Sequence, residues 1–170
     1  MVNQENSSDA EDSDAQQPLL NTDDEPRTVL AAVDTSPSAA RVISTAARFV
    51  RAFPAAALHI LHVARSSRLD HARVGVPSLG SDALEDAKEH LAYHVRLARS
   101  QCRNSITGHF LAGDPTGEIL RSCLELKADM LVIATNDHAG FERLLLGSIA
   151  ERLMRKAPCS VVVVRPRGAH

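Results

Sequence analysis

The sequence is poor in aromatic residues and contains no tryptophan. Phe, Trp and Tyr together make up 3% of its 170 residues, whereas hydrophobic residues reach 44%. This composition is sufficient for one well-buried domain, and we expect a core made mostly of Leu, Val, Ile and Ala. The same shortage argues against binding of single-stranded nucleic acid, which depends on aromatic side chains that stack on the bases.

Cysteine is also scarce. The three cysteines are Cys102, Cys123 and Cys159. None belongs to a CxxC pair or another metal-ligand spacing, and we interpret them as reduced, packed thiols. The histidines form no ligand pattern either, because His59 and His62 should face opposite sides of a strand. The helix that carries His90 and His94 lacks an acidic partner for a metal motif. We therefore expect no metal site.

Long apolar runs and motifs of hydrolytic enzymes are missing as well. No apolar run reaches the roughly 18 residues that a membrane span needs, and the first residues do not resemble a secretory signal. We therefore expect a cytoplasmic protein. The patterns G-x-S-x-G, H-E-x-x-H and G-x-x-x-x-G-K-[ST] are all absent, and no catalytic residue is predicted.

Charge is distributed unevenly along the chain. Residues 1–26 contain no Lys or Arg but hold eight acidic residues, which are Glu5, Asp9, Glu11, Asp12, Asp14, Asp23, Asp24 and Glu25. The remaining 13 acids face 19 bases, so residues 27–170 carry a net charge of +6. The acidic segment is too polar to bury much surface, and we predict a disordered tail followed by one domain over residues 27–170. The bases of the domain form no long run, so nucleic-acid binding is not indicated.

Apolar runs and helical periodicity alternate throughout the domain. Strands are predicted at 28–34, 56–64, 104–111, 129–135 and 160–165. Helices are predicted after Pro37 and Ser38, at 82–101, within 113–128 and at 148–156, and residues 65–81 form a long loop. In the third helix, the inward face should contain Ile119, Leu120, Cys123 and Leu124. This alternation predicts an open parallel sheet with helices on both faces and a ligand crevice beyond the carboxyl ends of the strands.

Two segments at those strand ends carry candidate binding groups. Asp34 ends the first strand, where it either caps the following helix or hydrogen-bonds a ribose or nucleobase. Ser148 begins the last helix and Glu151 follows three residues later, which is the pattern of a capping box. The amides of this first turn and the helix dipole favour an anion. A capping box also stabilises a helix without any ligand, by about 1 kcal/mol.

Together these segments resemble the universal stress protein family. The resemblance rests on TVLAAVDTSPSAARVISTAA, LHILHV, GDPTGEILRSCLELKADMLVIAT and GFERLLLGSIAERLMRKAPCSVVVVRP, and it covers roughly residues 27–166. It implies an α/β domain similar to other adenine-nucleotide-binding folds (nucleotide-binding alpha-hydrolase-like), with strand order 3-2-1-4-5. It also implies a homodimer formed by the last strand, from Val161 to Val164, which agrees with an apolar edge strand that needs covering.

In ATP-binding members of this family, a loop of the form G-x-x-G-x9-G-[ST] surrounds the phosphates. Gly147 and Ser148 match the end of this motif. Ala134 and Asp137 stand where its first two glycines are expected, and Gly140 lies in the same loop. The resemblance therefore implies a phosphate site that is retained at the helix and altered in the loop.

The adenine and ribose side of the family site is matched. Asp34, followed by Thr35, corresponds to the acid that ends the first strand, and Val63 corresponds to the adenine-facing valine of the second. The resemblance thus implies ATP or AMP as a ligand, with Mg²⁺ only alongside the nucleotide.

Asp137 decides between the remaining functional hypotheses. A carboxylate about 4 Å from a phosphate costs roughly 1 kcal/mol in water and about 4 kcal/mol at an effective dielectric of 20, unless Mg²⁺ bridges the two groups. The leading hypothesis is a non-catalytic, stress-related module that senses adenine nucleotides. The second is a nucleotide-free homodimer that binds an unknown protein partner. A slow ATP hydrolase ranks last, because no base is evident.

Overall fold

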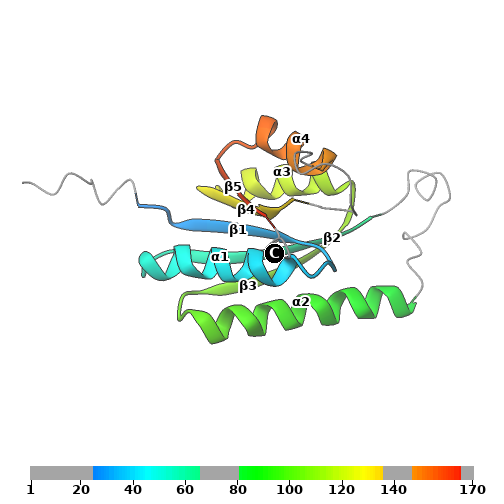
Figure 1. Cartoon of the computed structure of the whole chain (residues 1–170), viewed down its shortest axis with the longest axis horizontal. Helices are drawn as coiled ribbons and strands as arrows, with labels where there is room; N and C mark the ends of the chain where they lie inside the picture. The colour runs from blue at the N-terminus through cyan, green and yellow to red at the C-terminus, as the bar shows by residue number, and fades with distance from the viewer. Residues whose placement is uncertain (1–24, 66–80, 136–146, 166–170) are drawn as a thin grey trace, which may run out of the picture.

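The structure is a computed structural model that describes residues 25–65, 81–135 and 147–165 (Figure 1). Five strands alternate with four helices within these ranges. They are β1 (Thr28–Val33), α1 (Ala39–Ala52), β2 (Ala57–Arg65), α2 (Ser81–Gln101), β3 (Ile106–Gly113), α3 (Pro115–Glu125), β4 (Met130–Ala134), α4 (Ser148–Lys156) and β5 (Ser160–Val164). Residues 1–24 of the predicted 1–26 tail and residues 66–80 of the predicted 65–81 loop lie outside the described residues, whereas Arg65 ends β2 and Ser81 begins α2.

The strands form a single parallel sheet in the order β3-β2-β1-β4-β5. Leu30 of β1 lies opposite His59 of β2 on one side and Leu131 of β4 on the other. Helices α1 and α2 cover one face of the sheet, and α3 and α4 cover the other (Figure 1). The predicted fold and strand order are therefore confirmed. The helices between consecutive strands are the crossovers that parallel pairing requires.

Each face of the sheet has its own aliphatic core. Val29, Ala31 and Val132 pack against α1 and α2, whereas Leu30 and Leu131 pack against α3 and α4. Successive residues of a strand point to opposite faces, so a central strand must be apolar throughout. This explains why TVLAAV has no polar alternation, and it confirms the expected core of Leu, Val, Ile and Ala.

The inward face of α3 differs from the prediction at one residue. Ile119 and Cys123 are buried, but the Leu124 side chain is 65% exposed. The helix instead buries the small polar residues Thr116 and Ser122, which rotates its contact stripe away from Leu124. The expectation that Leu124 faces the core was wrong.

The ends of the elements determine where a ligand can bind. All five strands run in one direction, so their carboxyl ends meet at one edge, where α1, α3 and α4 begin (Figure 1). Helices α1 and α2 end at the opposite edge, where β1 begins. No helix within the described ranges is long and apolar enough to cross a membrane.

Candidate functional site

A cavity of about 780 Å³ lies at the carboxyl edge of the sheet. Its wall includes the ends of β1, β2 and β4 together with the first residues of α1, α3 and α4. Six of the predicted site residues line it, namely Asp34, Thr35, Val63, Ala134, Gly147 and Ser148. The other two, Asp137 and Gly140, lie outside the described residues. The cavity stands where parallel α/β sheets bind their ligands.

Asp34 shapes the loop that leaves β1. Its Oδ1 accepts hydrogen bonds from the Ser36 amide at 3.0 Å and from the Ser36 hydroxyl at 2.5 Å. Helix α1 begins at Ala39 after Ser38, with no side-chain cap, so Asp34 does not cap it. No described residue donates to Asp34 Oδ2. The carboxylate is exposed at the cavity with one oxygen available to a ligand donor.

Val63 and Asp34 are neighbours across two strands. Val33 of β1 lies opposite His62 of β2, so the residues that follow them, Asp34 and Val63, lie side by side where β1 ends, while β2 continues to Arg65. Val63 is half-buried and packs with the α3 and α4 core. The cavity thus has an apolar wall next to a carboxylate, a combination suited to a flat base with a hydroxylated sugar.

His62 is a cavity residue that the sequence did not reveal. It is 6% exposed, its Nδ1 lies 3.1 Å from the Val33 carbonyl oxygen, and its ring stacks on Phe110. Because a carbonyl only accepts, Nδ1 donates and Nε2 is left as the acceptor. Burial lowers the pKa of His62, against the opposing effects of the Val33 hydrogen bond and the charge of Asp34. Its position immediately before Val63 was the available signal.

The remaining described histidines and cysteines give no chemical site at the cavity. Nδ1 of His59 lies 2.8 Å from Nε2 of His109, and neither histidine lines the cavity. The described residues contain no group of three potential metal ligands. All three cysteines are unbridged, and burial raises the pKa of the Cys123 thiol to about 12, so this thiol is a poor nucleophile.

Ala134 ends β4 in an extended conformation. It pairs with Val164, and the next amide, of Thr135, donates to the Val164 carbonyl at 3.0 Å. Lys127 is the only non-glycine residue with positive φ in the described ranges, so Ala134 occupies no conformation that demands glycine. Replacing glycine by alanine here therefore adds one methyl group and no backbone strain.

Helix α4 begins differently from the prediction. Gly147 is its N-cap, with φ −54° and ψ 148°, and no side chain caps the helix. Ser148 is the first helical residue, and the Glu151 carboxylate accepts from Arg155 at 2.8 Å. The predicted capping box was therefore wrong, because the N-cap lies one residue earlier. Ser148, Ile149 and Ala150 of the first turn line the cavity, and no side chain among the described residues accepts from their amides.

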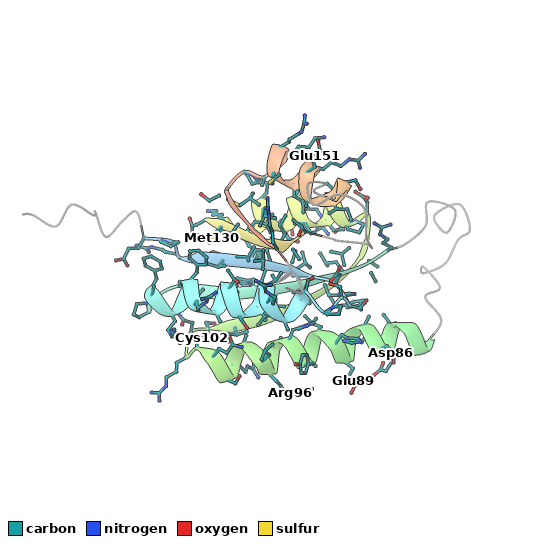
Figure 2. The ribbon with its side chains drawn as sticks, in the orientation of Figure 1. Asp86, Glu89, Arg96, Cys102, Met130 and Glu151 are labelled. Atoms are coloured by element: carbon teal, nitrogen blue, oxygen red, sulfur yellow. The ribbon has the colours of Figure 1, made fainter. Side chains whose placement is uncertain are left out.

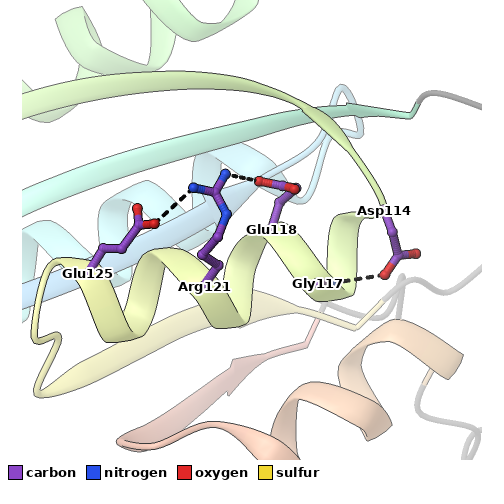
Figure 3. A network of polar contacts seen from close by, with 5 residues as sticks. All are labelled: Asp114, Gly117, Glu118, Arg121 and Glu125. Carbon is purple, nitrogen blue, oxygen red and sulfur yellow. Dashed lines mark hydrogen bonds and ion pairs between the residues drawn. The ribbon is translucent and has the colours of Figure 1, made fainter. Parts of the chain in front are cut away.

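Helix α3 begins at the same cavity with its own cap. Asp114 Oδ2 accepts from the Gly117 amide at 2.9 Å, and Pro115 follows as the first helical residue (Figure 3). Further along α3, Arg121 pairs with Glu118 and Glu125. A carboxylate already occupies this helix start, so an anionic ligand is favoured at α4 and disfavoured at α3.

The fold and this cavity define a doubly wound α/β domain whose cavity lies at the carboxyl edge of the sheet, beside the N-terminus of α4. The model of the universal stress protein family matches residues 25–165. A universal stress protein of Methanocaldococcus jannaschii is 34% identical over 97 residues, which cover 54% of this chain and 57% of that relative. The chain belongs to the universal stress protein family.

Two solved structures share the fold. The universal stress protein of Archaeoglobus fulgidus in complex with dAMP has a TM-score of 0.62 at 22% identity, covering 82% of this chain and 98% of that one. A family protein from Arabidopsis thaliana with AMP bound has a TM-score of 0.57 at 19% identity, covering 84% and 94%.

Proposed function

We propose that the cavity binds an adenine nucleotide and that the protein is a non-catalytic nucleotide-sensing module of its family. The observation that carries this proposal is the start of α4, where Gly147 provides no side-chain cap and Ser148, Ile149 and Ala150 line the cavity. Amides at a helix N-terminus bind phosphate through hydrogen bonds and the helix dipole.

The opposite wall of the cavity supports the nucleoside half of the ligand. Asp34 Oδ2 is an acceptor suited to ribose hydroxyls, and Val63 offers an apolar surface for the base. Two family members of the same fold hold AMP and dAMP. Both halves of a nucleoside monophosphate therefore have matching groups in this chain.

We further propose that a monophosphate binds more tightly than ATP. The β- and γ-phosphates would extend along the loop that contains Asp137, where the family motif has glycine. Repulsion of roughly 1 to 4 kcal/mol per charge pair is large compared with the roughly 8 kcal/mol of a micromolar complex. Mg²⁺ between Asp137 and the phosphates would reduce this cost.

Calorimetry with AMP, ATP and Mg-ATP on three proteins tests this proposal. The proteins are the wild type, Asp137→Asn and, as a matched neutralisation in the same segment, Glu142→Gln. We expect AMP to bind the wild type most tightly, and Asp137→Asn to gain about tenfold for ATP, or about 1.4 kcal/mol, with Glu142→Gln unchanged. Absence of heat with millimolar AMP would reject nucleotide sensing and favour the nucleotide-free module.

We also propose a homodimer through β5. This strand is an edge of the sheet, and Val161, Val162 and Val163 are only half-buried. An apolar edge with unpaired main-chain groups favours pairing with a second copy. We expect Val162→Lys to convert the dimer to a monomer in analytical ultracentrifugation. Thr107→Lys, at the exposed opposite edge, should leave the dimer intact; a wild-type monomer would reject the proposal.

A further inference from the structure

A second hollow, of about 470 Å³, lies at the edge of the sheet opposite the nucleotide cavity. It is bounded by the ends of α1 and α2 and by the residues that lead into β3, where Cys102 marks the end of α2 in Figure 2. Arg51, Arg99 and Arg103 line it, and all three side chains are exposed. We call this site the arginine hollow.

Stabilisation of the helix ends explains two of the three arginines but not the third. Arg51 and Arg99 lie in the last turns of α1 and α2, where a cation stabilises the helix dipole. Arg103 lies beyond the end of α2 and has no such role. The ion pairs between described residues involve Lys88, Arg121 and Arg155 and none of these three. The hollow therefore gathers positive charge without a described acidic partner.

The other polar side chains of the hollow are engaged within the domain. Ser100 Oγ donates to the Leu97 carbonyl at 2.7 Å, and Gln101 Nε2 donates to Ser44 at 3.1 Å. Asn104 Nδ2 lies within hydrogen-bond distance of four main-chain carbonyls from the last turn of α1 to the residue before β2, those of Val50, Phe53, Pro54 and Ala56. The groups left for a partner are the guanidinium donors, which select carboxylates or phosphates.

The acidic N-terminal segment, which is rich in carboxylates, is attached to the domain at this edge. Asp129 Oδ2 accepts from the amides of Arg27 and Thr28, each at 2.8 Å, which fixes the start of β1. The Ala57 amide donates to the Arg27 carbonyl, and the Leu58 amide donates to the Ser105 carbonyl, beside the hollow. The start of β1 is thus two strand spacings, on the order of 10 Å, from the start of β3. The acidic segment that precedes residue 26 joins the domain at this point.

We propose that the acidic N-terminal segment, residues 5–25, docks on the arginine hollow of the same molecule. A stretch of eleven residues can extend by up to about 35 Å, so the acids from Asp9 to Asp14 have ample reach. Covalent attachment makes the encounter intramolecular, with an effective concentration on the order of millimolar. The segment carries eight acids and no base, and the hollow carries three arginines and no described acid.

Docking gives the segment a regulatory role that is independent of nucleotide binding. It masks the arginine hollow from other acidic molecules, which must displace the segment to bind there. A modification that adds charge near Ser7, Ser8 or Ser13 strengthens the contact, and high salt releases it.

NMR of the isotope-labelled full-length chain tests the contact from both sides. The hollow variant combines Arg51→Gln, Arg99→Gln and Arg103→Gln. The control removes the same charge from the other face of the sheet by Arg152→Gln, Arg155→Gln and Lys156→Gln. We expect the amide signals of residues 5–25 to shift several-fold more in the hollow variant than in the control. The difference should vanish at 1 M salt, where the screening length is about 3 Å.

The reciprocal variant carries Asp9→Asn, Glu11→Gln, Asp12→Asn and Asp14→Asn. It should shift the side-chain Nε–H signals of Arg51, Arg99 and Arg103, and it tests the contact even if the hollow variant fails to fold. Equal shifts in hollow and control variants, or none in either experiment, would overturn the proposal. Shifts that disappear on tenfold dilution would also overturn it, because they would place the segment of a second copy on the hollow.

Discussion

Helices α3 and α4 begin at the same cavity, but only the first turn of α3 has a side-chain cap. Helix α3 has Asp114 as its cap, with Pro115 as its first residue. Helix α4 has Gly147 and no side-chain cap. A helix start that is satisfied by its own carboxylate contributes stability, whereas an uncapped start has amides for a ligand. The comparison indicates that the start of α3 stabilises the fold, whereas the start of α4 is the proposed phosphate site.

The largest predicted effect comes from giving α4 the cap that α3 has. Gly147→Asp places a carboxylate where the phosphate should bind, and we expect AMP affinity to fall about 30-fold, or about 2 kcal/mol, within the range for adjacent like charges. The unfolding free energy should stay equal or rise, because aspartate is a good N-cap. Calorimetry and urea denaturation measure the two quantities.

Gly147→Ala is the matched control, since it adds a methyl group without charge or hydrogen-bond acceptor. Its AMP affinity should fall by less than that of Gly147→Asp. Equal losses in the two variants would mean that space, and not charge, limits binding at α4.

Acidic pH should destabilise the protein through two buried histidines, His62 in the cavity wall and His94 on α2. Burial lowers the pKa of His62 and His94, so the folded state keeps them neutral while the unfolded state takes up protons below about pH 6.5. Stability should be complete above pH 6.5 and fall as the pH drops, by at most about 1.4 kcal/mol per unit for each histidine. Urea denaturation at pH 7.5 and 5.5 measures the loss.

His94→Phe should make that pH dependence smaller. His94 is 5% exposed, and its Nδ1 has no hydrogen-bond partner among the described residues. The charges of His90 and His62 also lower the pKa of His94, and that of Asp34 opposes them. Identical pH profiles for the variant and the wild type would contradict this assignment.

Removing the cap of α3 should lower the stability and leave AMP binding nearly unchanged, which is the reverse of the effect expected from capping α4. Asp114→Ala leaves the Gly117 amide without its acceptor, and we expect a loss of about 1 kcal/mol in unfolding free energy. AMP affinity should remain within twofold. Asp114→Ser, which retains a capping oxygen, should restore most of the stability. A large loss of AMP binding in Asp114→Ala would show that α3 also holds the phosphate.

The smallest effect is expected at Glu151. The structure gives this side chain an exposed ion pair with Arg155 and no capping contact. Glu151→Gln should therefore cost less than about 0.5 kcal/mol, the usual worth of such a pair. A loss near 1 kcal/mol in thermal or urea unfolding would restore the capping box that the sequence suggested.

The fold was predictable because its signals repeat in every unit. Strands such as TVLAAV are apolar on both faces, and turn residues separate them from helical periods, so the parallel sheet was confirmed. Details that depend on one residue of offset were harder. S-x-x-E is compatible with an N-cap at Ser148 or at Gly147, and only the backbone path distinguishes them.

The cavity was predictable in outline but incomplete in its polar wall. Asp34 follows the end of β1 and Val63 lies two residues before the end of β2, and the topology places the carboxyl ends of these strands together. The burial of His62 depends on the register between β1 and β2, which brings its ring to the Val33 carbonyl. Leu124 was misplaced because hydrophobicity alone cannot show that a helix buries Thr116 and Ser122 instead.

The most direct test of the central claim is the affinity of the wild-type protein for AMP relative to adenosine, measured by calorimetry under one set of buffer conditions. If the uncapped start of α4 holds the phosphate, AMP should bind at least about tenfold more tightly than adenosine, a difference of about 1.4 kcal/mol. Equal affinities for the two ligands would contradict the assignment of α4 as the phosphate site.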